Sequence, residues 1–108
     1  MKALVVQSDL SVKIQEKDVP VPKEGEALIK LTAASINRRD QWIREGKYPG
    51  IKPGVILGSD GAGEVVEVGG AAESPWLGKK VIINPNINWG NDDAVQQQSY
   101  HVLGMPSD

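Results

Sequence analysis

Five glycines fall within fourteen residues, LGSDGAGEVVEVGG at 57–70, and this density raises the question of phosphate binding. The dinucleotide fingerprint requires G-x-G-x-x-G between a strand and a helix, so that helix N–H groups point at the pyrophosphate. Here the glycines stand at 58, 61 and 63, and Val66 occupies the position of a third spaced glycine. No Lys-Ser or Lys-Thr pair follows, which excludes a P-loop. The β-branched residues after Gly63 instead predict a strand whose glycines allow a sharp bend or the close approach of another backbone.

Polar side chains that could take part in chemistry lie in two other parts of the sequence. Asn37 precedes a segment with helical periodicity, where Asn is a good N-cap, and Asp40 falls in the first helical turn, where the helix dipole favours a carboxylate. His101 is the only histidine, and it could join Asp60 at a metal, but a lone histidine near a polar terminus is more typical of a solvated side chain. Cysteine is absent, which excludes disulfides and thiolate zinc sites.

The elements that must position these residues are mainly β. Alternating or β-branched runs predict strands at 2–7, 11–19, 26–35, 63–68 and 79–84. In the second strand Val12 and Ile14 alternate with polar residues, which predicts a half-buried strand. In the third, Ala27, Ile29, Leu31 and Ala33 are expected on one face. A helix is predicted at 38–45, with Gly46 as its C-terminal stop. The Asn- and Gln-rich residues from 85 onward permit no assignment.

Composition limits the function classes. A chain of 108 residues has room for one domain, and twelve glycines and seven prolines among short β-type runs favour an all-β barrel or sandwich. The net charge of −2 gives no case for nucleic acid or an anionic membrane. The opening MKALVVQSD becomes polar too early for a signal peptide, so we expect a cytoplasmic protein. The ending LGMPSD, without a closing strand, is either a frayed terminus or the point at which a longer chain was cut.

Four segments together resemble the medium-chain dehydrogenase/reductase superfamily. They are MKALVV, VPVPKEGEALIKLTAASINRRDQWIREGKYP, LGSDGAGEVVEVG and LGKKVIINP, which cover essentially the whole chain. The resemblance is to the N-terminal GroES-like β-barrel of zinc-type alcohol dehydrogenase-like and quinone-oxidoreductase-like members. It implies a partial, mainly β barrel with one short helix near 38–45, a single domain over 1–108 that is truncated before its closing strands, and a Rossmann domain absent from this chain.

The resemblance also locates the zinc positions of the family. The zinc-dependent branch has a cysteine three residues before an Asp and a histidine in a GHE segment. By this alignment Asn37 replaces the cysteine, Asp40 matches the Asp, and Ser59 and Asp60 replace the histidine and glutamate. An amide and a hydroxyl are poor zinc ligands. The four-cysteine structural zinc lobe would fall near 86–98, which reads NINWGNDDAVQQQ. We therefore expect no zinc and no metal site.

The resemblance implies roles for the candidate residues. Asn37 is expected to line the nicotinamide and substrate pocket, Asp40 to order the cleft, and Trp42 to border the active site unless it is plain core. Ser59 and Asp60 are expected across the cleft from Asn37, with Asp60 a candidate for a buried, hydrogen-bonded acid. The basic residues near the helix form either a solvated face or an anion-recognising rim in which Arg38 contacts the cofactor; they are Arg38, Arg39, Arg44, Lys47 and Lys52.

The leading hypothesis is the N-terminal half of a zinc-independent, NAD(P)H-dependent oxidoreductase. Hydride would pass between the nicotinamide and a small-molecule carbonyl, enone or quinone, and the resemblance favours NADPH over NADH. The Rossmann domain would bind the cofactor, so the 108-residue chain alone should be inactive. The alternative is a stand-alone GroES-like binding module that self-associates through open edge strands as a homo-oligomer. A true zinc alcohol dehydrogenase is set aside because its ligands are replaced.

Overall fold

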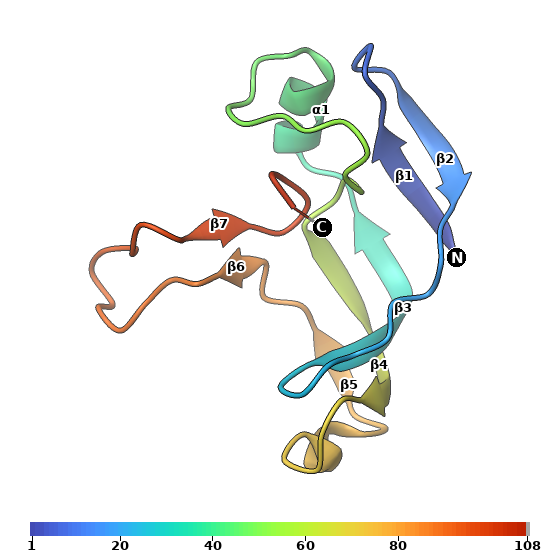
Figure 1. The fold of residues 1–108 in the computed structure, drawn as a ribbon, viewed down its shortest axis with the longest axis vertical. Coiled ribbons are helices and arrows are strands. Elements are labelled where there is room, and N and C mark those ends of the chain that lie inside the picture. The colour runs from blue at the N-terminus through green and yellow to red at the C-terminus, as the bar shows by residue number, and fades with distance from the viewer. Residues whose placement is uncertain (108) are drawn as a thin grey trace. The chain divides into compact units, whose positions relative to one another are not determined.

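The computed structural model describes residues 1–107 and divides the chain into two compact units. The first combines Met1–Lys17, Ser35–Ser59 and the chain from Asn84 onward, and the second combines Asp18–Ala34 with Asp60–Ile83. The regular elements of the described residues are β-strands, one α-helix and one 3-10 helix, which confirms the predicted mainly β fold with a single short α-helix (Figure 1). None of the described helices has the length and apolar character needed to cross a bilayer.

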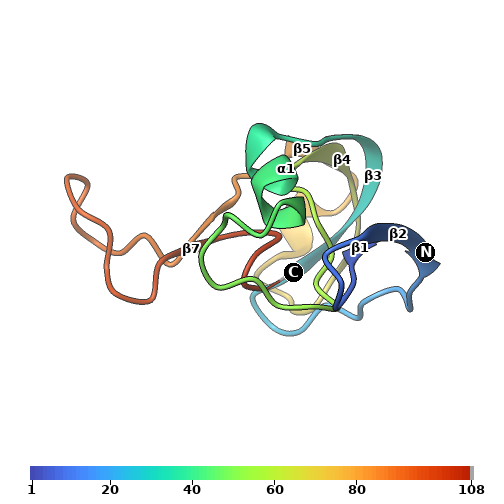
Figure 2. The same cartoon turned by 90° about the horizontal axis from the view of Figure 1, so that it is seen from above.

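Strands β1 (Lys2–Val6) and β2 (Val12–Glu16) form an antiparallel ribbon whose register runs from Lys2↔Glu16 to Val6↔Val12. The two strands lie side by side in both views (Figures 1 and 2). On its other side β1 meets the chain at 54–57, with Val6 N–H bonded to the Val55 carbonyl. Because β1 is therefore central and β2 is an edge strand, the burial predicted for β2 is only partly correct: Val12 is half-buried, but Ile14 is 72% exposed.

The helix α1 (Arg38–Arg44) confirms the prediction of a helix near 38–45. Its C-terminus is closed by two hydrogen bonds, from Gly46 N–H to the Ile43 carbonyl and from Lys47 N–H to the Trp42 carbonyl. This is the Schellman pattern, which requires a left-handed residue just past the helix. Gly46 supplies it with φ of 72°, so the glycine stops the helix as the sequence predicts.

The hydrophobic core of the first unit collects residues from all three of its chain segments. It consists of Val6, Ile43, Val55, Leu57 and Met105, with Leu4, Val12, Tyr48 and Ile51 packed against it. Ile43 fixes the inner face of α1, because it is completely buried in this cluster. The core thus holds α1, through Ile43 near its C-terminal end, and the segment before Ser59 in one unit.

The second unit contains a three-stranded sheet in the order β3 (Ala27–Ser35), β4 (Asp60–Val68), β5 (Lys80–Ile82), although Ser35 itself belongs to the first unit. A Cβ built on Gly63 would lie 2.2 Å from the Lys30 carbonyl oxygen, which confirms the expectation that a glycine here admits another backbone. The face of β3 on which the alternating apolar residues were expected is largely open, since Leu31 is 53% exposed. Alternation yields burial only under a second layer, and η1 (Ser74–Trp76) is the one other element that the structure describes in this unit.

Residues from 85 onward, which the sequence left unassigned, form a second small hairpin. Strands β6 (Asn86–Ile87) and β7 (His101–Val102) pair antiparallel, with Asn86 opposite Val102 (Figure 1). The long loop between them is closed by an edge-to-face contact of Trp89 and Tyr100, whose ring centroids are 5.2 Å apart. The Tyr100 hydroxyl also donates to Asn86 Oδ1 at 2.7 Å. We call residues 86–102 the hairpin lobe.

Candidate functional site

The start of α1 is tied to the Gly-rich segment through one buried carboxylate. Asp40 is 3% exposed, and its Oδ2 accepts the backbone N–H of Asn37 at 2.8 Å, which is the carboxylate arm of a capping box. Its Oδ1 accepts the N–H of Gly58 at 3.2 Å. Both oxygens therefore hold backbone donors, and this geometry favours a supporting role for Asp40 over acid–base chemistry.

Asn37 and Ser59 lie side by side at the helix start. Asn37 has extended backbone angles as the N-cap residue, and its side-chain Nδ2 donates to Ser59 Oγ at 3.3 Å. Ser59 is 5% exposed, whereas Asn37 is exposed to solvent. The expected proximity of Ser59 and Asn37 is thus present, while their catalytic and cofactor-binding roles stay predictions. A hydroxyl and an amide both offer hydrogen-bond donors to a ligand oxygen.

The donor set at this site does not fit the catalytic zinc of the family. Zinc in such sites takes imidazole, thiolate or carboxylate ligands, whereas the two positions here carry a carboxamide and a hydroxyl. The one nearby carboxylate, Asp40, already accepts two backbone N–H groups. Within residues 1–107 there is no group of three or more His, Cys, Asp or Glu placed to hold a metal ion.

Neither of the other two positions considered for a metal has a complete set of donors among residues 1–107. His101 is half-buried in β7, rather than fully solvated as expected, and its Nδ1 lies 3.2 Å from the Ser99 carbonyl oxygen. The hairpin lobe has no cysteine to bind a structural zinc. Its loop is closed instead by Trp89, whose Nε1 donates to the Asp92 carbonyl at 3.0 Å, together with the Tyr100 contact.

Two other candidates differ from expectation. Trp42 is 47% exposed, so the interpretation of this residue as plain core is wrong, because it is the next residue, Ile43, that turns inward on the short helix. Asp60 begins β4 in the second unit and is exposed, so the expectation of a buried acid is also wrong. Successive side chains of an extended backbone point in opposite directions. Here the side chain of Ser59 points into the protein, and that of Asp60 is exposed. The placement of Asp60 across from Asn37 stays a prediction.

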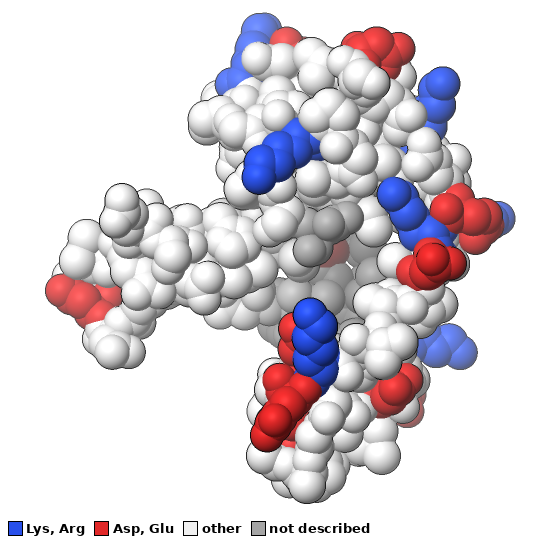
Figure 3. Space-filling view, in the orientation of Figure 1, with Lys and Arg blue, Asp and Glu red and all other residues white. Residues whose placement is uncertain are grey.

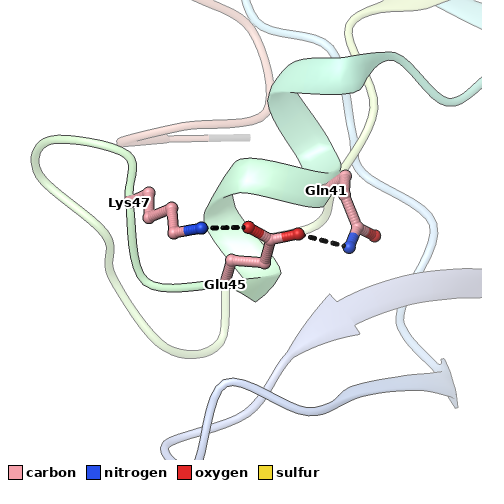
Figure 4. Close-up of polar contacts among 3 residues, drawn as sticks. All are labelled: Gln41, Glu45 and Lys47. Atoms are coloured by element: carbon pink, nitrogen blue, oxygen red, sulfur yellow. Dashed lines mark hydrogen bonds and ion pairs between the residues drawn. The ribbon is translucent and has the colours of Figure 1, made fainter.

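The basic residues around α1 differ in exposure and pairing, and the choice between a solvated face and an anion-recognising rim stays a prediction. Arg38 is exposed, Arg39 is half-buried, and Lys47 pairs with Glu45 at 2.7 Å. Figure 4 shows Glu45 between Lys47 and Gln41, and the hydrogen bond from Lys47, followed by that from Gln41, lowers the pKa of the Glu45 carboxyl. On the face seen in Figure 3 the Lys and Arg side chains form separate patches interspersed with acidic ones.

Sequence reasoning missed the particular role of Arg39. Its Nη1 donates to the carbonyl of Leu103, 64 residues further along the chain, at 2.6 Å. No local sequence pattern predicts a hydrogen bond of this kind, because the acceptor is a backbone carbonyl, which every residue has. The only available signal was an arginine on the same helical turn as the buried Asp40.

The fold and site define an alcohol dehydrogenase-type GroES-like domain, and comparison with known proteins agrees. The family described as the alcohol dehydrogenase GroES-like domain matches residues 23–106. The chain belongs to this family, and so to the medium-chain dehydrogenase/reductase superfamily. The resemblance found in the sequence is thereby confirmed.

Several relatives of this chain are named as dehydrogenases or as dehydrogenase-like proteins. The chain is 43% identical over 76 residues to the zinc-type alcohol dehydrogenase-like protein YogA of Leptosphaeria maculans, an alignment covering 68% of this chain and 21% of that protein. It is 41% identical over 93 residues to L-threonine 3-dehydrogenase of Pyrococcus abyssi, covering 83% of this chain and 27% of that one. The chain thus spans less than a third of the length of these relatives.

Solved structures give the same result. An Escherichia coli short chain alcohol dehydrogenase (rspB) complexed with the cofactor NADH superposes with a TM-score of 0.85 at 25% identity, over 100% of this chain and 33% of that one. An NAD-dependent alcohol dehydrogenase superposes with a TM-score of 0.81 at 30% identity, over 96% of this chain and 33% of that one. These names attribute dehydrogenase activity and NAD(H) to the relatives themselves. Quinone reduction and the absence of zinc are expectations drawn from the residues of this chain, and NADPH is an expectation drawn from the family resemblance alone.

Proposed function

We propose that this chain is the N-terminal domain of an NAD(P)(H)-dependent oxidoreductase that transfers hydride to a small-molecule carbonyl, enone or quinone without a catalytic zinc ion. The observation that carries the proposal is the pairing of Asn37 Nδ2 with Ser59 Oγ at 3.3 Å. These are the two positions at which the zinc branch has its cysteine and histidine. A neutral hydrogen-bonding pair therefore stands where a metal would otherwise polarise the substrate.

Bound nicotinamide supplies the hydride, and the protein supplies orientation and hydrogen bonds. We assign the Asn37 amide and the Ser59 hydroxyl to the substrate oxygen, where preorganised donors stabilise the negative charge that develops in the transition state. Two neutral donors polarise an oxygen less than a metal ion does, which favours conjugated acceptors over simple alcohols as substrates. Arg38, exposed beside Asn37, is assigned to the cofactor.

NADH and NADPH are both candidates for the cofactor. The resemblance favours NADPH, whereas one structural relative is solved with NADH. The residues that discriminate a ribose hydroxyl from a phosphate belong to the Rossmann domain. Both cofactors therefore enter the first assay.

The test uses the complete gene product from its source organism, whose intact mass we expect to be several times the 11.6 kDa of this chain. Oxidation of NADH and of NADPH is followed with benzoquinone, methyl vinyl ketone and cinnamaldehyde, and reduction of NAD is followed with ethanol and L-threonine. Zinc is measured by atomic emission on the same preparation. We expect turnover of the conjugated acceptors and far less than one zinc per chain.

Variants identify the site. Asn37→Ala and Ser59→Ala should each lower kcat about tenfold to a hundredfold, in line with the loss of one oxyanion donor. Glu45→Gln, an exposed change at the opposite end of the helix, should leave kcat unchanged. Stoichiometric zinc whose removal abolishes turnover would overturn the zinc-independent mechanism. A natural product of 11.6 kDa that turns over no substrate would favour the binding-module alternative instead.

A further inference from the structure

Arg39 makes an unusual number of contacts for a residue on a short surface helix. Its Nη1 donates to the Leu103 carbonyl at 2.6 Å, and its Nη2 donates to the Met105 carbonyl at 3.3 Å. Its Nε donates to the Tyr48 hydroxyl at 3.4 Å, and its guanidinium lies 5.2 Å from the centre of the Tyr48 ring. The planar guanidinium of arginine can donate to two backbone carbonyls of one segment at the same time. The ammonium group of lysine is a point charge without this forked geometry.

The segment that Arg39 holds is packed against the Gly-rich stretch, backbone on backbone. Gly104 stands between the two bonded carbonyls, and a Cβ built on it would lie 2.3 Å from the carbonyl oxygen of Gly58. Met105 is 1% exposed in the core of the same unit, and its sulfur accepts the N–H of Lys52 at 3.3 Å. The C-terminal turn is therefore anchored on both sides of its contact with Gly58.

Gly58 immediately precedes Ser59, so its placement sets the position of the Ser59 side chain. Its N–H is held from one side by Asp40 Oδ1 at 3.2 Å. Its carbonyl is approached from the other side by Gly104, in the turn that Arg39 clamps. Two consecutive residues of one helix, Arg39 and Asp40, thus act on the two peptide groups that flank the Cα of Gly58, by different routes.

We propose that Arg39 is a positioning residue for the Asn37–Ser59 pair. The guanidinium clamps the backbone at Leu103 and Met105, the clamp seats Gly104 on Gly58, and the seated backbone keeps Ser59 Oγ within hydrogen-bond distance of Asn37. The catalytic consequence of this clamp rests on the proposed function. The effect of the Arg39 clamp on the local stability of the backbone can be measured whether or not that function is correct.

The experiment compares Arg39→Gln and Arg39→Lys with Arg44→Gln as the matched control, all in the complete gene product. Arg44 is exposed on the last turn of the same helix, so its loss removes an equal charge away from the clamp. Hydrogen–deuterium exchange with mass spectrometry is recorded for peptides that cover 55–60 and 101–107. Steady-state kinetics with NADH, NADPH and benzoquinone are recorded on the same preparations.

We expect Arg39→Gln to speed exchange about tenfold or more in both peptides, Arg39→Lys to fall between it and the unmodified protein, and Arg44→Gln to change neither. Arg39→Gln should lower kcat about tenfold while the KM for the nicotinamide stays within about twofold, because orientation of the reacting groups is impaired and cofactor binding is not. Faster exchange confined to 101–107, with 55–60 and kcat unchanged, would overturn the positioning role. Faster exchange in both peptides in a protein with no turnover would retain the clamp and reject the proposed function.

Discussion

At the residue scale, the carboxylate of Asp40 is the group on which the site geometry depends most directly. It is buried, and each of its oxygens accepts one backbone N–H, from Asn37 and from Gly58. Sequence reasoning found this residue through its place in the first helical turn, and it preferred a supporting role. The second bond, to a glycine eighteen residues later, lies outside any local pattern.

Asp40→Asn should therefore destabilise the protein although it preserves the side-chain shape. One oxygen becomes an NH₂ donor that faces a backbone N–H, which leaves a buried donor unpaired at a cost of about 2 kcal/mol. Urea unfolding followed by circular dichroism measures the change. The exposed Glu45→Gln variant serves as the control, and an Asp40→Asn protein as stable as the control would contradict the assignment of both bonds.

A second prediction at this scale concerns pH. The hydrogen bond from Lys47 lowers the pKa of Glu45 from its ordinary value of 4.5, so the ionised form is favoured in the folded state. The stabilising contribution is present above the unfolded pKa and is lost as the pH falls through the lower folded pKa. Carbon-detected NMR titration should give a Glu45 pKa below 4.5, and Lys47→Ala should raise it. A pKa that does not respond to Lys47→Ala would show that the pair in Figure 4 is not populated in solution.

At the scale of elements, the strands and the helix were predictable wherever the local pattern matched the burial. The helix near 38–45 has a cap, an acidic first turn and a glycine stop, and all three appear in α1. The open face of β3 and the exposure of Ile14 were not predictable, because alternation indicates which residues share a face and not whether another layer covers it. The two-residue strands β6 and β7 lack enough residues to display any period.

The glycines of β4 offer a matched pair of substitutions within one strand. A Cβ on Gly63 would lie 2.2 Å from the backbone oxygen of Lys30, whereas a Cβ on Gly61 would meet only the ends of the Leu31 and Ile83 side chains, at 2.9 and 3.0 Å. Backbone cannot yield without separating the strands, so Gly63→Ala should cost about 3 kcal/mol. Gly61→Ala should change stability by less than about 1 kcal/mol, since side chains can turn away and alanine suits a strand better than glycine.

The free energy of unfolding of the two variants, obtained by urea titration, provides the measurement. Each variant serves as the control for the other, because both changes add one methyl group to the same strand. Equal losses of stability would show that β3 and β4 do not approach as closely at Gly63 as the structure indicates.

At the scale of the whole molecule, the family and the fold class follow from the sequence, whereas the site follows only in part. The motifs INRRD and LGSDG place Asn37, Asp40 and Ser59 in the chain, and the first unit brings them together. What the motifs do not encode is the third segment of that unit, the turn held by Arg39, because its contribution is made by carbonyl groups and a glycine. Long-range backbone contacts of this kind depend on the complete fold.

The chain by itself should bind no dinucleotide. It contains no G-x-G-x-x-G segment, and its Gly-rich residues form strand β4 in place of a strand-to-helix turn. Titration of the 108-residue chain with NADH, followed by nicotinamide fluorescence, should therefore show no saturable change. Saturation at micromolar NADH would contradict the assignment of cofactor binding to a separate domain.

The hairpin lobe closes with an aromatic contact and neutral hydrogen bonds, through Trp89, Tyr100 and Asn86. A lobe held by four thiolates depends on a supply of zinc during folding, and it opens when oxidants convert those thiolates to disulfides and release the ion. Neither event has a target here, because the chain has no cysteine. We therefore expect the folding of the hairpin lobe to depend neither on a supply of zinc nor on the redox state of thiols.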